Sequence, residues 1–119
     1  MKTRTLFLTV FFLVETSALI AQERTEKFEV KGNCGMCETR IEKAAGSVEG
    51  VCSADWIQES KMLELTFDPA RTSLDDIQKA IAAVGHDTPL YRAKNEVYKN
   101  LPTCCKYKRS VPEKKNGEK

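Results

Sequence analysis

Two cysteines lie where a strand pattern gives way to a helix pattern, and this feature constrains the fold most. The pair is Cys34-Gly-Met-Cys37. Side chains alternate over residues 27–31, with Phe28 and Val30 on one face, which predicts a strand. From Glu38 onward the apolar residues recur at helical spacing, at Ile41, Ala44, Ala45 and Val48. Both sulfurs then face one point at the helix start, where unpaired N–H groups favour the thiolate.

The rest of the pattern predicts three more strands and a second helix. Strands are expected over residues 51–57, over 62–67 and, as a last extended segment, over 87–91. The second helix is capped by Thr72 or Ser73, and Gly85 ends it. The order βαββαβ predicts an α+β, ferredoxin-like sandwich, in which an antiparallel sheet carries two helices on one face.

Residues 1–21 have the pattern of a secretory signal peptide. Two basic residues precede a short apolar run over residues 6–14, and small residues follow it. That run is too short to span a bilayer, so we expect no stable membrane insertion after cleavage. Cleavage is expected after Ala21, or alternatively after Ala18. The product is exported, to the periplasm, and is long enough for one small domain.

The charge of the exported chain argues against a nucleic-acid partner. Basic and acidic residues nearly balance, and the basic excess lies in residues 106–119. A basic tail can bind nucleic acid or membranes, but this one is short and export separates it from nucleic acid. We interpret it as a solubilising tail.

The five cysteines are clustered rather than spread along the chain. Cys34 and Cys37 form a close pair, Cys52 stands alone, and Cys104 and Cys105 are adjacent. An oxidising compartment permits disulfides, but a disulfide framework would distribute its cysteines. The clustering therefore indicates sites. Cys52 is the exception, because its strand face predicts a buried, inert thiol.

Four motifs together resemble one known family. They are the Cys-x-x-Cys motif, Val48-Glu-Gly-Val51, Phe67-Asp-Pro69 and Ala83-Val-Gly-His-Asp87. With the order of elements, they resemble the heavy-metal-associated (HMA) domain over about residues 26–91. That family includes copper chaperones, metal-binding modules of copper- and zinc-pumping ATPases, and the periplasmic mercury-binding protein of mercury resistance.

The resemblance implies a metal-binding protein rather than an enzyme. An HMA domain is expected over residues 22–91, followed by a C-terminal extension over 92–119. One soft metal ion is expected on Cys34 and Cys37: Cu(I) first, with Zn(II), Hg(II) or Cd(II) as alternatives. The protein would sequester this ion or pass it to a metal-transporting ATPase, an efflux component or another acceptor.

Several further residues are candidate ligands. In the family, a methionine two residues before the first cysteine packs beneath the loop; here that position is Gly32, and Met36 lies inside the motif as a weak thioether candidate. His86 follows the second helix, where some related chaperones carry a metal-proximal histidine. Cys104 and Cys105 add sulfur if the extension folds back, or else form a vicinal disulfide or stay as spare thiols.

A thiol–disulfide oxidoreductase is the rival hypothesis. Cys-x-x-Cys at a helix start is also a redox motif. The thioredoxin pattern expects an aromatic residue before the first cysteine and a proline between the two. Asn33 and Gly35-Met36 match neither.

Overall fold

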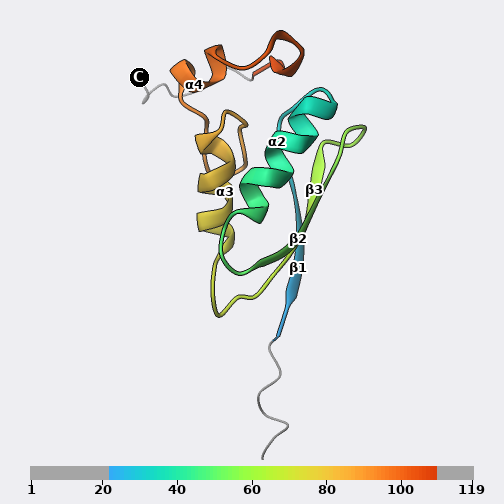
Figure 1. Ribbon diagram of the computed structural model, residues 1–119, viewed down its shortest axis with the longest axis vertical. Coiled ribbons are helices and arrows are strands. Elements are labelled where there is room, and N and C mark those ends of the chain that lie inside the picture. Colours follow the sequence, from blue (N-terminus) through green and yellow to red (C-terminus); the bar gives the residue numbers. More distant parts are fainter. Residues whose placement is uncertain (1–21, 110–119) are drawn as a thin grey trace, which may run out of the picture.

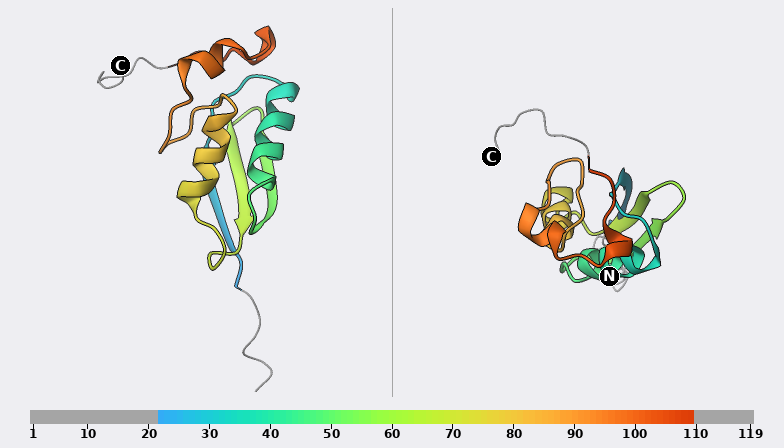
Figure 2. Two further views of the ribbon diagram at one scale, coloured as in Figure 1. Left: turned by 60° about the vertical axis from the view of Figure 1, so that its left-hand side comes forward. Right: turned by 90° about the horizontal axis from the view of Figure 1, so that it is seen from above.

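Three strands form one antiparallel sheet, and two helices cover one of its faces. The computed structural model describes residues 22–109. Its elements are β1 (Arg24–Glu29), α2 (Gly35–Gly46), β2 (Val51–Ile57), β3 (Met62–Phe67), α3 (Leu74–Ala83), α4 (Asn95–Lys99) and the 3-10 turn η3 (Thr103–Cys105). The strand order is β1-β3-β2, with β3 antiparallel to both neighbours. Helices α2 and α3 lie side by side on the sheet, which confirms the α+β fold class (Figures 1 and 2).

Both predicted helices form, but only α3 has the predicted ends: α2 begins at Gly35, before Glu38, and ends at Gly46, before Val48. The Ser73 hydroxyl accepts a hydrogen bond from the Asp76 N–H at 3.2 Å, so Ser73 is the cap of α3. Gly85 follows α3 with a φ of +113°, a backbone conformation that glycine adopts without a steric penalty. Between helices and sheet lies a core of fully buried apolar side chains that includes Val30, Ile41, Leu63, Leu65, Ile77 and Ile81.

Residues 87–91 form no strand, so the expected fourth strand is absent from the described part of the chain. The Lys31 N–H still donates to the Asp87 carbonyl at 3.0 Å, as a neighbouring strand would require. The ladder stops because Pro89 has no N–H to donate, and Thr88 instead closes a turn with Tyr91. The ferredoxin-like sandwich is therefore missing its edge strand.

Cys52 is exposed, and the prediction of a buried thiol is wrong. The register of β2 against β3 shifts between Val51 and Ser53, which places a β-bulge at Cys52. A bulge breaks the alternation of faces on which the prediction relied. The Cys52 sulfur instead lies 3.2 Å from the Glu23 carboxylate.

The C-terminal extension folds back over the end of the domain where α2 begins. Helix α4 and η3 cross that end in Figures 1 and 2. Leu101, Cys105 and Tyr107 of the extension are buried in the same core as the sheet and helices. The expected signal peptide over residues 1–21 and the last ten residues of the tail lie outside the described residues. Within residues 22–109, no helix is long and apolar enough to cross a bilayer.

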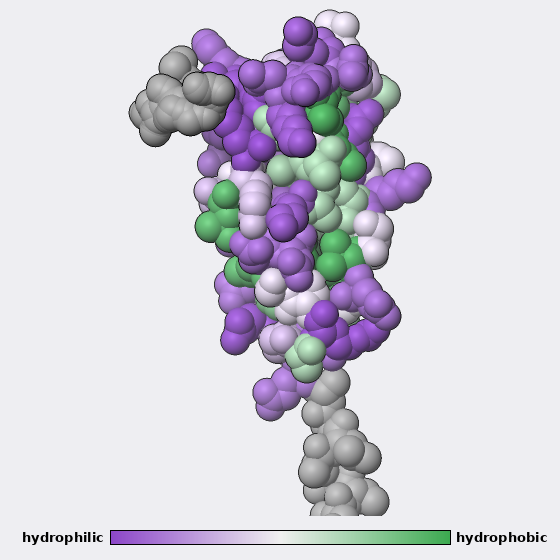
Figure 3. All heavy atoms as spheres, turned by 90° about the vertical axis from the view of Figure 1, so that its left-hand side faces the viewer, coloured by the Kyte–Doolittle hydropathy of each residue, from purple (hydrophilic) through white to green (hydrophobic). Residues whose placement is uncertain are grey.

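The outer side of the helical layer is mostly hydrophilic. On the face shown in Figure 3, hydrophobic side chains occupy several small areas separated by hydrophilic ones. Scattered apolar side chains are normal on a protein surface and do not by themselves indicate a partner.

Candidate metal centre

The Cys34–Cys37 pair lies at the N-terminus of α2, as the sequence predicts. Cys34 is the N-cap residue, and its carbonyl accepts hydrogen bonds from the Cys37 and Glu38 N–H groups at 2.9 and 3.0 Å. This turn brings the two Sγ atoms to 3.6 Å. Cys37 is fully buried and accepts a hydrogen bond from the Asn33 N–H, whereas Cys34 is partly exposed. The Cys34 sulfur is thus accessible to solvent, whereas the Cys37 sulfur is held in the interior by its hydrogen bond from Asn33.

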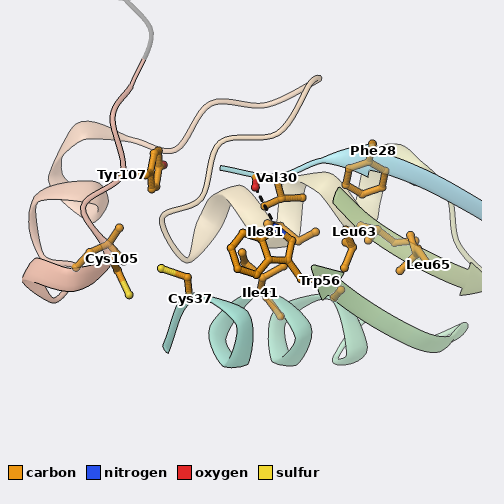
Figure 4. Close-up of a cluster of buried hydrophobic side chains, with 14 of the residues drawn as sticks. Phe28, Val30, Cys37, Ile41, Trp56, Leu63, Leu65, Ile81, Cys105 and Tyr107 are labelled. Carbon is orange, nitrogen blue, oxygen red and sulfur yellow. Dashed lines mark hydrogen bonds between the residues drawn. The ribbon is translucent and has the colours of Figure 1, made fainter. Parts of the chain in front are cut away.

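The extension adds two sulfurs to this pair. The Cys34 Sγ lies 3.1 Å from the Cys104 Sγ and 3.6 Å from the Cys105 Sγ. The Sγ atoms of these three residues all lie within 4.8 Å of one another. Figure 4 shows Cys37 and Cys105 pointing toward each other, one from α2 and the other from the extension. Four thiols from two segments about 70 residues apart in sequence therefore lie together at one end of the domain.

The four thiols differ in acidity. Burial raises the pKa of Cys34, but hydrogen bonds with Cys104, Cys37 and Cys105 outweigh it and lower the pKa to about 6. Burial and a hydrogen bond with Cys105 raise the pKa of Cys37 to about 11. The pKa of Cys104 is raised mainly by its hydrogen bond with Cys34, and that of Cys105 mainly by burial. The cluster thus combines one thiol of lowered pKa, Cys34, with three thiols of raised pKa.

A cation borders the cluster. The Arg40 guanidinium, one turn into α2, donates a hydrogen bond from Nη1 to the Cys105 Sγ at 3.4 Å. Thiolates on a metal ion carry excess negative charge, which a neighbouring guanidinium offsets.

Trp56 fills the space beneath the metal loop. A Cβ added to Gly32 would lie 3.0 Å from the Trp56 ring and 3.1 Å from the Cys37 Cβ, so the three are in tight contact. The indole N–H donates to the Val30 carbonyl at 3.0 Å, which fixes the ring in the orientation of Figure 4. The ring therefore supports the loop at Gly32.

Gly32→Ala is expected to destabilise the protein by about 1–3 kcal/mol, because the added methyl group overpacks the contact with Trp56 and Cys37. Urea unfolding of the reduced protein measures the change. Gly46→Ala, at the end of α2, is the matched control: its Cβ meets nothing within 4 Å, and alanine favours the helix. Equal stability of the two variants would show that the space beneath the loop is not tight.

His86 is buried behind the cluster. Its Nδ1 lies 2.8 Å from the Lys31 carbonyl oxygen, which can only accept, so Nδ1 carries the proton. Its Nε2 is buried and has no hydrogen-bond partner within the described residues. The ring stacks on Tyr107 with centroids 5.6 Å apart. His86 is not among the ligand atoms that cluster with Cys34, so the structure places it near the site but outside the sulfur group.

The metal-free protein is expected to become less stable as the pH decreases, because His86 is buried in its neutral form. Burial lowers the pKa of His86 below its ordinary value, so the unfolded chain takes up this proton more readily. The contribution is fully present above the unfolded pKa of about 6.5 and is lost as pH falls below it. Urea unfolding at pH 7.5 and 5.5 should show a smaller loss for His86→Gln than for the unaltered protein. Cys34 titrates in both proteins, so their difference isolates His86; equal losses would contradict this assignment.

Met36 lies on the outer side of the cluster. Its side chain is 52% exposed, and its Sδ lies 3.6 Å from the Cys104 Sγ. The structure thus brings Met36 to Cys104 rather than to Cys37.

The comparisons agree with this geometry. Residues 28–87 match the family described as "Heavy-metal-associated domain". The chain belongs to this family. The matched residues run from β1 to the residue after His86, and they include Cys34 and Cys37 but neither Cys104 nor Cys105.

The relatives of this heavy-metal-associated domain include proteins named for mercury transport and for copper delivery. The chain is 32% identical over 82 residues to the mercuric transport protein periplasmic component of Pseudomonas aeruginosa, covering 68% of this chain and 90% of that protein. It is 30% identical over 63 residues to the copper chaperone CopZ of Staphylococcus aureus, covering 52% and 93%. Oxidized MerP from Ralstonia metallidurans CH34 is a structural neighbour with a TM-score of 0.54 and 34% identity, covering 56% of this chain and 94% of that one.

Three functional features of this domain escaped the sequence patterns. Arg40 has the spacing of an exposed helix residue, and nothing in the sequence relates it to Cys105. The sequence places Trp56 in the core, as observed, but does not indicate its contact with Gly32 beneath the loop. Arg109 lies in the basic tail, yet it forms a buried ion pair with Asp87 at 2.8 Å. Apolar and aromatic residues in the extension indicate that it could dock on the domain, and of these Leu101 and Tyr107 are buried and Tyr98 packs against the core.

Proposed function

We propose that this protein is an exported soft-metal-binding protein that holds one ion on the thiolates of Cys34 and Cys37. The observation that carries the proposal is the convergence of sulfurs at the start of α2, with an acidic thiol at its centre. Nothing in this constellation requires catalysis, and its relatives are named as transport components and chaperones. We therefore assign binding rather than enzymatic activity.

Cu(I) is the cargo that we favour, with Hg(II) next. Thiolate and thioether ligands select soft ions, and both occur here. Zn(II) and Cd(II) remain alternatives, since four thiolates could surround either ion. The single histidine, His86, has a buried Nε2 without a hydrogen-bond partner among the described residues. We propose that His86 does not ligate the ion directly and at most influences the metal affinity of the sulfur ligands.

The chain organisation supports sequestration more than rapid transfer. We propose a signal peptide over residues 1–21, the metal domain over 22–91 and a capping extension over 92–119, with periplasmic export. Because the described part of the extension lies over Cys34 and Cys37, an acceptor reaches the ion only through the exposed Cys104 side or by displacing the extension. A metal-transporting ATPase or an efflux component would be such an acceptor.

Native mass spectrometry of the reduced chain from Gln22 onward tests the proposal. Anaerobic titration with Cu(I), Hg(II) and Zn(II) is expected to give one ion per chain, and competition among the three ranks them. If none of these ions forms a complex, the binding function is wrong.

The same thiols suit disulfide exchange, and a separate assay distinguishes that function. The acidic Cys34 lies 3.1 Å from Cys104, which is the arrangement of an attacking thiolate and its partner. Turnover in insulin reduction would establish an oxidoreductase. Absence of turnover together with metal binding is the result we expect.

A further inference from the structure

The two cysteines of the extension do more than cover the family motif. Cys104 and Cys105 lie 3.1 and 3.6 Å from Cys34, sulfur to sulfur, and the three Sγ atoms are mutually within 4.8 Å. We propose that Cys34, Cys104 and Cys105 form a three-thiolate site for a soft metal ion, sharing Cys34 with the Cys34–Cys37 pair. The proposal rests on the proposed function and gives the extension a share in holding the cargo.

The fold fixes this trio from the extension side. The Cys105 N–H donates to the Pro102 carbonyl at 2.8 Å, closing the turn η3, and Cys105 itself is fully buried. Two residues on, Tyr107 is buried and donates from its hydroxyl to the Gly85 carbonyl at 2.6 Å. Adjacent side chains on this turn thus take separate roles: Cys105 points into the domain and Cys104 faces solvent.

The charge of the surroundings suits three thiolates. Cu(I) with three thiolates carries two negative charges, which would be costly beside a buried core. The Arg40 guanidinium donates to Cys105 at 3.4 Å and offsets part of this charge. A two-thiolate site on Cys34 and Cys37 alone would not require a cation at Cys105.

The exposed sulfurs supply a route for the ion. Cys104 is exposed and lies 3.6 Å from the exposed Met36 thioether. Cu(I) arriving as a complex of a small thiolate binds the Cys104 sulfur as that thiol loses its proton. The bond to the original thiolate then breaks, the departing thiolate takes up a proton, and copper stays Cu(I) throughout. Cys34 and Cys105 complete the set by the same exchange.

X-ray absorption of the Cu(I)-loaded, reduced full chain counts the sulfurs directly, without any substitution. We expect three sulfurs in the unaltered protein and in Cys37→Ser, which leaves the trio intact. When they are introduced into Cys37→Ser, the further changes Cys104→Ser and Cys105→Ser are each expected to leave two sulfurs, because Cys34 then keeps a single sulfur neighbour. They should also lose at least about tenfold in Cu(I) affinity, measured by competition with a chromogenic Cu(I) chelator. Cys52→Ser, which changes a cysteine outside the cluster, is the matched control and should change neither value.

The outcomes separate the two proposals. Two sulfurs in the unaltered protein, or loss of the third sulfur in Cys37→Ser, would overturn the trio while leaving metal binding by Cys34 and Cys37 in place. Failure of the unaltered protein to bind any of the tested ions would instead overturn the proposed function. Circular dichroism confirms that each variant is folded; should Cys105→Ser fail to fold, the unaltered protein and Cys104→Ser still decide, because Cys104 is exposed.

Discussion

Cys34→Ser is expected to lower Cu(I) affinity by more than about 100-fold, above the ~10–100-fold that loss of an outer-shell partner costs. The reason is geometric: the Cys34 Sγ lies within 3.6 Å of the sulfurs of Cys37, Cys104 and Cys105. Removing any one of those three leaves Cys34 with two others. Removing Cys34 breaks both the pair and the trio. Serine keeps the cap position and the shape, so the fold should survive.

Chelator competition on the reduced protein measures this loss, with Cys52→Ser as the cysteine control. Cys37→Ser is the informative comparison, because it removes a motif cysteine yet leaves the three clustered sulfurs. We expect it to lose clearly less affinity than Cys34→Ser. Equal losses for the two would mean that the extension contributes no ligand.

Arg109→Met is expected to destabilise the protein by about 3–5 kcal/mol, a large share of the ~5–15 kcal/mol of a small domain. Arg109 donates to both carboxylate oxygens of Asp87, at 2.8 and 3.1 Å, and both side chains are only 11% exposed. Removing the guanidinium leaves a nearly buried carboxylate without its main partner. Arg109 also donates to the Ala93 carbonyl, so the same change removes a hydrogen bond within the extension.

Arg92→Met is the matched control for this prediction. Arg92 also contacts Asp87, but at 3.8 Å and with 39% of its side chain exposed, so we expect a loss below about 1 kcal/mol. Urea unfolding measures both variants. The double substitution Asp87→Asn with Arg109→Met should cost less than the sum of the two single changes, because no uncompensated charge remains. Additive losses would show that the two side chains do not stabilise each other.

The local elements could be predicted from the sequence because they depend on neighbouring residues. Alternation gave β2 and β3 their observed bounds, and the candidate caps Thr72 and Ser73 indicated the start of α3, where Ser73 is the cap. The thiol pair at the start of α2 was equally local. The burial of Cys52 was predicted wrongly for a physical reason. A single bulge changes which face of the sheet a residue occupies, and the sequence of one strand does not show how that strand pairs with its neighbour.

The extension could not be predicted because its position depends on contacts far apart in sequence. The sequence left open whether Cys104 and Cys105 meet Cys34, 70 residues earlier. What decides it in the structure is the Asp87–Arg109 ion pair and the burial of Tyr107, neither of which has a local pattern. Asp87 shows the same limit, since the residue expected to start a strand instead anchors the extension.

Trp56 has one consequence for experiment. It is the only tryptophan in the chain, and its ring touches the same point beneath the loop as the Cys37 Cβ. An ion bound at Cys34 and Cys37 would therefore lie next to the sole indole fluorophore, and a heavy ion such as Hg(II) would quench its emission. The intrinsic fluorescence of Trp56 would thus report whether the metal site is occupied, so that metal uptake and release can be followed in real time without a label.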